Sequence, residues 1–440
     1  MYNITDFLNI IGNYSFMTDN GEFFLLGTLV KEEKDNNSII LRAQVPISDH
    51  HEYDAEVINL FGSINNVKIS LLACHMCTMS WVSKAETINV VFEIDKIVIG
   101  DHYKGTANIH CVYTEFPALN YFYMNCFSLN FGESIKKEYF DSNPPLAATT
   151  QYGSVLLHPM LSYGSDPHQL TLKSVPCIRY SFYSPKTLDG AIAHMSCLRD
   201  LFSFLADGYI DLPSIIYSTS SSADDPPIDD KAIVQLNQKT RIPETGEHFL
   251  LTRDTIEKDF QKVVVNWLEF YENSVYIPAL FFEIITNRSI GINEFLNLAQ
   301  AVEIYSSYFR NEEAKAVCNK DPDAEIKDKP SLKHRLIDIF TFLQSLLCIS
   351  DEQRDRLARI ISKNRNFYTH YSRDGKEPAY KTISRMILLL RFVILALVYK
   401  HIGVEDQGIQ YCKRIDDYKA IGESIDIILN NEHRPKKVLE

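Results

Sequence analysis

Two residue types suited to phosphate chemistry stand five positions apart in the segment 363–371. Arg365 is a planar, permanently charged cation that can bind phosphate oxygens, and His370 can move a proton near neutral pH. Asn366 directly follows the arginine. Such a pair can cleave a phosphodiester without a metal ion if the substrate supplies its own nucleophile, as RNA does through its 2′-hydroxyl. In that chemistry His370 is the general base or general acid, and Arg365 stabilises the charge on the phosphorane oxygens.

The spacing of this pair carries a geometric problem. At about 100° per residue on a regular helix, positions 365 and 370 point about 140° apart. We therefore expect either an irregular helix here or a site that is completed by a second subunit. A lone histidine on a helix is more often a surface or core residue. Its spacing from Arg365 and Asn366 favours catalysis instead, and Asn366 could orient the arginine or the phosphate by hydrogen bonding.

Basic and aromatic residues around the motif are suited to binding a nucleic-acid strand. The predicted phosphate contacts are Arg359, Lys363 and Arg373, and the aromatic residues that could stack on unpaired bases are Tyr368 and Tyr371. For Tyr368, a place in the helical core is the competing interpretation.

Charge is unevenly distributed along the chain. The 440 residues have a formal net charge of −13, yet ten basic and only three acidic residues lie between Arg354 and Arg391. One basic region in an acidic protein is consistent with a localised polyanion site, although a solvated basic helix face would look the same. Nine cysteines at irregular spacing, and an N-terminus without a signal-peptide pattern, predict a soluble protein of the reducing cytoplasm.

The elements that must position the motif fall into two regions. Short alternating runs predict strands in the N-terminal region: 23–30 and 38–45 form a hairpin, and Val90, Phe92 and Ile94 share one face. This pattern is typical of a sandwich or a curled antiparallel sheet. A helix that packs on the sheet is predicted from Ser184 to Gly208. The predicted domains are 1–210 (β-rich, sensor or regulatory), 211–252 (linker or surface loop) and 253–440 (helical).

The C-terminal region is predicted to be almost entirely helical. Helices are expected over 295–309, 331–342 and 383–399 and around the motif, whereas the polar stretch 311–329 is expected to be a loop. The apolar helix 383–399 is interrupted by two arginines, so it is too short to span a membrane. The predicted fold class is therefore α+β, with an N-terminal antiparallel β-rich domain followed by an all-α helical bundle.

The pattern Arg365-Asn366-x-x-x-His370 resembles the signature of HEPN-superfamily ribonucleases. The wording Arg-Asn-Phe-Tyr-Thr-His-Tyr in particular is similar to the ApeA-like branch, in which a β-rich domain precedes the helical nuclease. The resemblance implies a metal-independent endoribonuclease without a cofactor, paired as a homodimer through the HEPN domain. It also implies cleavage of cellular RNA such as tRNA in anti-phage defence by abortive infection, with a phage-derived trigger acting on the N-terminal domain. Glu303 resembles a polar residue of the first HEPN helix and could hold Arg365 or His370.

Other interpretations stay open at this point. A non-catalytic HEPN-fold adaptor could bind RNA, a nucleotide or a protein partner, or the main function could belong to the N-terminal domain while the helices serve dimerisation. Cys74-x-x-Cys77 could begin a zinc site, but no second pair stands at a suitable spacing for four ligands. The chain contains no Gly-rich phosphate loop, which leaves ATP-driven chemistry without support.

Overall fold

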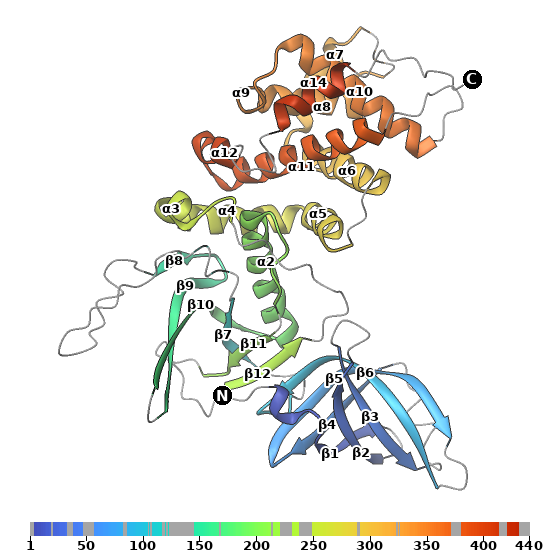
Figure 1. Ribbon diagram of the computed structural model, residues 1–440, viewed down its shortest axis with the longest axis vertical. Coiled ribbons are helices and arrows are strands. Elements are labelled where there is room, and N and C mark those ends of the chain that lie inside the picture. The colour runs from blue at the N-terminus through green and yellow to red at the C-terminus, as the bar shows by residue number, and fades with distance from the viewer. Residues whose placement is uncertain are drawn as a thin grey trace, which may run out of the picture. The chain divides into compact units, whose positions relative to one another are not determined.

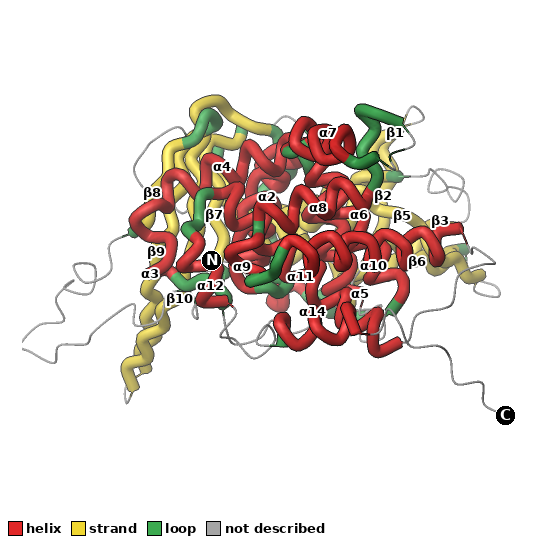
Figure 2. The backbone as a smooth tube through the Cα atoms, turned by 90° about the horizontal axis from the view of Figure 1, so that it is seen from above, coloured by secondary structure: helices red, strands yellow, loops and turns green. Residues whose placement is uncertain are grey.

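The computed structural model of the protein forms two compact units. The N-terminal unit comprises Met1–Arg199 and Ile210–Ile242, and the helical unit comprises Asp200–Tyr209 and Pro243–Glu440. All described strands belong to the first unit, and the described part of the second consists of helices and loops (Figure 2). The structure describes residues 4–18, 21–32, 38–46, 57–81, 86–103, 105, 108–116, 119, 122, 145–166, 169–212, 214–220, 231–236, 249–287, 291–322, 324, 326–370, 380–412 and 420–430.

The N-terminal unit is built on one antiparallel sheet. In the described residues, its strands follow the spatial order β3-β2-β1-β4-β5-β6-β12-β11-β7-β10-β9-β8. They are β1 (Ile11–Thr18), β2 (Gly21–Lys31), β3 (Ile39–Pro46), β4 (Ile58–Ile64), β5 (Val67–Trp81), β6 (Thr87–Ile99), β7 (Ile109–Glu115), β8 (Leu146–Thr149), β9 (Gly153–Asp166), β10 (Gln169–Lys186), β11 (Ser214–Ser218) and β12 (Lys231–Leu236). A short 3-10 helix, η1 (Ile4–Phe7), precedes them.

The first six strands close into a barrel because β3 pairs with both β2 and β6 (Figure 1). Strand β6 pairs with β5 along one edge, and its other edge pairs with two strands in succession. Its residues Thr87 to Glu93 pair with β3, and Lys96 to Ile99 pair with β12, which carries the sheet onward. Closure gives each of these six strands a neighbouring strand on both sides. The predicted hairpin of 23–30 and 38–45 is confirmed as β2 and β3.

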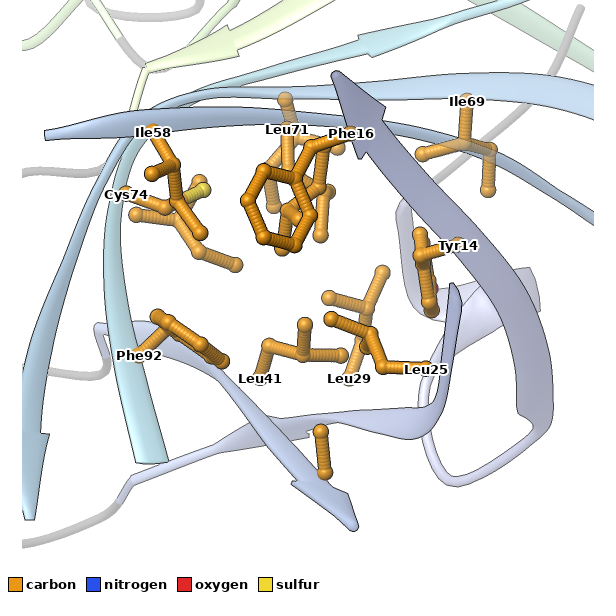
Figure 3. Close-up of a cluster of buried hydrophobic side chains, with 14 of the residues drawn as sticks. Tyr14, Phe16, Leu25, Leu29, Leu41, Ile58, Ile69, Leu71, Cys74 and Phe92 are labelled. Atoms are coloured by element: carbon orange, nitrogen blue, oxygen red, sulfur yellow. The ribbon is translucent and has the colours of Figure 1, made fainter. Parts of the chain in front are cut away.

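The interior of the barrel is filled by its own side chains. Phe16, Leu41 and Phe92, from three different strands, point toward one another in the lumen (Figure 3). Val90, Phe92 and Ile94 are all buried on one face of β6, as their alternation predicted. The two-residue connection Asn65-Asn66, with φ values of 51° and 64°, joins β4 to β5; asparagine tolerates this left-handed conformation of a type I′ turn.

The stretch 211–252, predicted as a linker, contains two strands of the sheet. β11 pairs with β7, and β12 pairs with β6. The short run Ser-Ile-Ile-Tyr-Ser of β11 is almost wholly buried. The apolar run of β11 is short, and the neighbouring Ser, Asp and Pro residues of 221–230 led to the prediction of a linker for the whole stretch. Residues 221–230 lie outside the described residues.

Helix α2 (Leu188–Ala206) contributes to both units. In the N-terminal unit it packs on the sheet, as predicted, because the His194 ring lies 5.3 Å from the rings of Tyr180 and Phe182. In the helical unit, Phe204 stacks on Phe281 at 4.6 Å between ring centroids, and Asp200 accepts a hydrogen bond from the Tyr271 hydroxyl at 3.0 Å.

The helical unit is organised around α11 (Tyr380–Ile402), which contacts α4, α6, α12 and α14. Nearly every side chain from Met386 to Tyr399 is buried, which explains the apolar run in the sequence. The unit comprises α3 (Arg253–Ile256), η5 (Glu257–Asp259), α4 (Phe260–Asn273), α5 (Tyr276–Asn287), α6 (Ile292–Phe309), α7 (Asn311–Lys320), α8 (Leu332–Phe342), α9 (Gln344–Leu347), α10 (Asp351–His370), α11, α12 (Asp406–Cys412) and α14 (Ile421–Asn430).

By length and composition alone, α11 could cross a membrane. It is 72% buried within the protein over its most apolar window, as is typical of the central helix of a folded domain.

The predicted order, a β-rich antiparallel region followed by a helical bundle, is confirmed. The prediction of a loop over 311–329 is wrong in its first half, because 311–320 forms α7. This helix buries only Ala314 and Cys318, so its sequence lacks a broad apolar stripe.

The dry barrel interior leads to a stability prediction. Phe92→Ala should lower the free energy of unfolding of the N-terminal unit by about 3–5 kcal/mol, because it opens a cavity that its neighbours cannot fill. Phe24, which is 65% exposed on the outside of the same barrel, provides the matched control; Phe24→Ala should change stability by no more than about 0.5 kcal/mol. Urea unfolding followed by circular dichroism compares the two. Equal losses would contradict a packed lumen.

A second prediction concerns His401 at the end of α11. Burial against Phe270, Phe309 and Tyr305 lowers the pKa of its imidazole, and the Glu269 carboxylate acts in the opposite direction. Since the unfolded chain then binds the proton more tightly, His401 should cost the helical unit stability as the pH falls below about 6.5. His401→Gln should reduce the loss in melting temperature of the helical unit between pH 7.5 and pH 5. An unaltered pH dependence in His401→Gln would refute this.

Candidate functional site

Helix α10 carries the motif, and its start is well specified by the sequence. The Ser350 hydroxyl accepts a hydrogen bond from the backbone N–H of Gln353 at 3.2 Å, and the Gln353 side chain accepts one from the Ser350 backbone at 3.0 Å. This reciprocal capping satisfies two of the free N–H groups at the helix start. Asp351 and Glu352 in the first turn complement the helix dipole. The helix then continues without interruption to His370.

Arg365 on α10 forms an ion pair with Glu303 on α6. One terminal nitrogen of its guanidinium lies 3.3 Å from Oε2 of Glu303, and the other lies 3.4 Å from Oδ1 of Asn366. The two ion-paired side chains are 29% and 34% exposed, so the pair contributes at most about 1 kcal/mol to stability. Its effect is to orient the guanidinium, which has five N–H donors and keeps some of them for a ligand.

The exposed face of α10 carries a different set of residues. Arg359, Lys363 and Asn366 are all exposed. Helical periodicity places these three positions and position 370 within an arc of about 60°. Arg365 points more than about 90° away from this arc, toward α6. The side chain of His370, and all of Tyr371 and Arg373, lie outside the part of the chain that the structure describes.

The expectation that Tyr368 stacks on a base needs correction. Its side chain is only 8% exposed, and its ring meets Phe295 of α6 edge-on at 6.5 Å between centroids. The ring of Phe367 lies 5.1 Å from it. Tyr368 is therefore a core residue that fixes α10 against α6, which was the competing interpretation. Of the two residues, Phe367 is the more exposed.

A second arginine approaches the same face of α6 from α8. The Arg335 guanidinium lies 3.2 Å from the Ser306 hydroxyl and 3.5 Å from Oδ1 of Asn311. Burial lowers the pKa of Arg335, and the negative charge of Glu303 acts against this shift. No motif in the sequence points to Arg335, because the packing of α6 against α8 and α10 is what brings it near Arg365.

Cys74 and Cys77, which could begin a zinc site, lie in different surroundings. Cys74 is fully buried in the barrel interior, and burial raises the pKa of its thiol. Cys77 is exposed. Among the described residues, no group of three or more His, Cys, Asp or Glu side chains could hold a metal ion.

Two family models match this chain. The model described as ApeA N-terminal domain 1 matches residues 10–267, which is more than half of the chain. The chain belongs to the ApeA family. A second model, described as Apea-like HEPN, matches residues 296–407 and so contains Glu303, Arg335 and the whole motif segment of α10. Searches of curated proteins and of solved structures found no match.

The family assignment confirms the resemblance drawn from the motif. This combination of domains is that of a HEPN-type defence effector, and HEPN domains are in general ribonuclease-like. The two matched ranges fall on the β-rich sheet with the helices that follow it, and on the helices from α6 to the start of α12. The residues that the motif singled out thus lie inside the HEPN match.

The Arg365–Glu303 pair yields a prediction for binding. Glu303→Gln removes a negative charge beside Arg365 but keeps an oxygen acceptor for it. Because phosphate contacts dominate nucleic-acid affinity, binding of RNA should tighten by about 3- to 10-fold. The melting temperature should change little, because the pair is partly exposed. Fluorescence anisotropy with 2′-fluoro RNA, which cannot be cleaved, measures the affinity.

The matched control is Glu405→Gln, which removes an exposed carboxylate between α11 and α12. It should leave RNA affinity within twofold of the wild type. Weaker binding by Glu303→Gln would mean that the carboxylate is needed to position Arg365 for the ligand.

Proposed function

We propose that this protein is a metal-independent endoribonuclease whose active site contains Arg365, Asn366 and His370. The observation that carries the proposal is the placement of Arg365. Its guanidinium is oriented by Glu303 and Asn366, yet it remains partly exposed on the side of α10 that faces α6, on the same helix that carries Arg359 and Lys363 on its exposed face. The match of this segment to the Apea-like HEPN model supports the same conclusion.

The proposed reaction is an internal transfer within RNA. The imidazole of His370 removes the proton from a 2′-hydroxyl, and the 2′-oxygen attacks the adjacent phosphorus in line with the leaving group. The new 2′-O–P bond forms as the P–O5′ bond breaks, and an imidazolium returns a proton to the 5′-oxygen. The products are a 2′,3′-cyclic phosphate and a 5′-hydroxyl end. Arg365 stabilises the developing negative charge, a contribution commonly worth a few kcal/mol.

The geometry of α10 favours a site shared by two subunits. Because the helix is continuous to His370, positions 365 and 370 point about 140° apart within one chain. An irregular helix would have reconciled them, but α10 has no such break. A homodimer through the HEPN domain brings Arg365 of one copy toward position 370 of the other.

The wider role proposed for the protein follows the family. The nuclease acts in the cytoplasm on cellular RNA such as tRNA, and it halts growth of an infected cell in abortive infection. The N-terminal unit responds to a phage-derived trigger and regulates the helical unit. In this scheme the substrate strand runs along the exposed basic face of α10, where Arg359 and Lys363 contact phosphates.

Cleavage of RNA by purified protein in EDTA tests the proposal. Wild-type protein incubated with total tRNA should produce fragments with 2′,3′-cyclic phosphate and 5′-hydroxyl ends, detected by mass spectrometry. Arg365→Ala and His370→Ala should each reduce the rate by about 100-fold or more, because each removes a group that acts in the transition state.

The control for these variants is Lys258→Gln in η5, which removes one exposed positive charge of the helical unit. It should cleave at the wild-type rate, and all variants should melt within a few degrees of one another. Intact RNA at high concentrations of folded wild-type protein would instead favour the non-catalytic adaptor.

A further inference from the structure

Arg335 contacts neutral side chains, unlike most other arginines in the described part of the helical unit. Among the described residues it forms no ion pair, and its partners are the hydroxyl of Ser306 and the amide oxygen of Asn311. Other arginines of this unit are paired with carboxylates: Arg253 with Glu257, Arg310 with Asp338, Arg354 with Asp351 and Asp355, Arg365 with Glu303, Arg385 with Glu423, and Arg391 with Asp207.

The surroundings of Arg335 leave its charge incompletely balanced. The side chain is half-buried, and neutral partners recover only part of the hydration that a guanidinium loses on burial. The Glu303 carboxylate acts on Arg335 as well as on Arg365. Among the described residues, one carboxylate thus acts on two guanidinium groups where α6, α8 and α10 pack together, and it forms an ion pair with Arg365 alone.

The spacing of the two arginines follows from α6. Arg365 contacts Glu303, and Arg335 contacts Ser306, three positions further along the same helix. Residues three apart lie on one face, about 4.5 Å along the axis. Both guanidinium groups thus approach the same side of α6 about one turn apart, as two anionic groups in succession would require.

We propose that Arg335 binds the phosphate next to the one that is cleaved, so that the site takes an RNA strand with at least two successive phosphates. This inference rests on the ribonuclease function proposed above. Arg365 contacts the scissile phosphate, Arg335 contacts its neighbour, and Ser306 and Asn311 are positioning residues that aim the Arg335 guanidinium. Without RNA, the Glu303 carboxylate balances part of the positive charge of Arg335 and Arg365. When RNA binds, its phosphates take over that role.

The experiment measures binding separately from cleavage. A 2′-fluoro RNA dodecamer has no nucleophile, so its affinity can be followed by fluorescence anisotropy at several salt concentrations. Arg335→Gln keeps a hydrogen-bonding side chain but removes the charge. It should weaken binding by about tenfold and reduce the slope of log affinity against log salt by about 0.7. Lys258→Gln, the charge-matched control, should retain the wild-type affinity and slope.

Short substrates locate the contact. A dinucleotide has one phosphate and a trinucleotide has two, and each can carry a single 2′-hydroxyl at the cleaved position. Arg335→Gln should reduce kcat/KM about tenfold for the trinucleotide and leave the dinucleotide nearly unchanged. Arg365→Ala should impair both. Equal effects of Arg335→Gln on the two substrates would overturn the assignment to the neighbouring phosphate.

A third measurement uses the unaltered protein, in case Arg335→Gln does not fold. Phenylglyoxal modifies accessible guanidinium groups, and peptide mapping reports the extent at each arginine. The dodecamer should protect Arg335 but not Arg354, which lies near the start of α10. Absence of protection at Arg335 would overturn the inference. If no RNA is cleaved but Arg335→Gln still weakens binding, the ribonuclease proposal fails while the anion site at Arg335 stands.

Discussion

The ion pair between Arg310 and Asp338 fixes the frame on which the candidate site depends. Two guanidinium nitrogens of Arg310 each lie 2.8 Å from a different oxygen of Asp338, and this hydrogen bonding raises the pKa of the arginine. The Phe342 ring lies 4.2 Å from the same guanidinium. Asp338 is nearly buried, and a buried charge that loses its partner typically costs about 3–5 kcal/mol. The pair therefore locks the end of α6 to α8, and the positions of Glu303 and Ser306 follow from that lock.

Arg310 and Arg335 both lie near α8 but differ in the partners of their guanidinium groups. Arg310 forms two hydrogen bonds with the Asp338 carboxylate, so an ion pair within the fold balances its charge. Among the described residues, Arg335 hydrogen-bonds to the neutral side chains of Ser306 and Asn311, and the Glu303 carboxylate acts on it electrostatically. A stability role explains the first arrangement well. It explains the second poorly, because a neutral residue of similar shape could link α8 to α6 without desolvating a cation.

The sequence predicted a helix or strand correctly where its own hydrophobic pattern was sufficient to identify it. Alternation placed Val90, Phe92 and Ile94 inside the sheet, and an apolar run marked α11. Local signals failed where packing decides. Helix α7 buries too few side chains to show an apolar stripe. Whether Tyr368 belongs to the core or to the substrate site depends on its contact with Phe295 of α6, 73 residues earlier in the chain. Arg335 could not be found at all, since its partners Ser306 and Asn311 carry no motif of their own.

The motif is recognisable from three residues, and its spacing predicts the relative direction of two of them but not their partners on other helices. Sequence spacing implied that Arg365 and position 370 diverge on a regular helix, and the continuous α10 bears this out for the backbone. The resemblance implied that Glu303 could hold Arg365 or His370, and the structure places it 3.3 Å from Arg365. Pairing across helices depends on their relative rotation, which no single segment of sequence specifies.

The filled barrel has a consequence for how this protein could detect another molecule. Phe16, Leu41 and Phe92 point into the lumen from three strands, so side chains of the barrel itself occupy its interior. The outer wall is the surface of these six strands that faces other molecules. There Ile11, Met17, Phe24 and Leu26 of β1 and β2 are each more than half exposed, a surface better matched to a macromolecule than to a small solute.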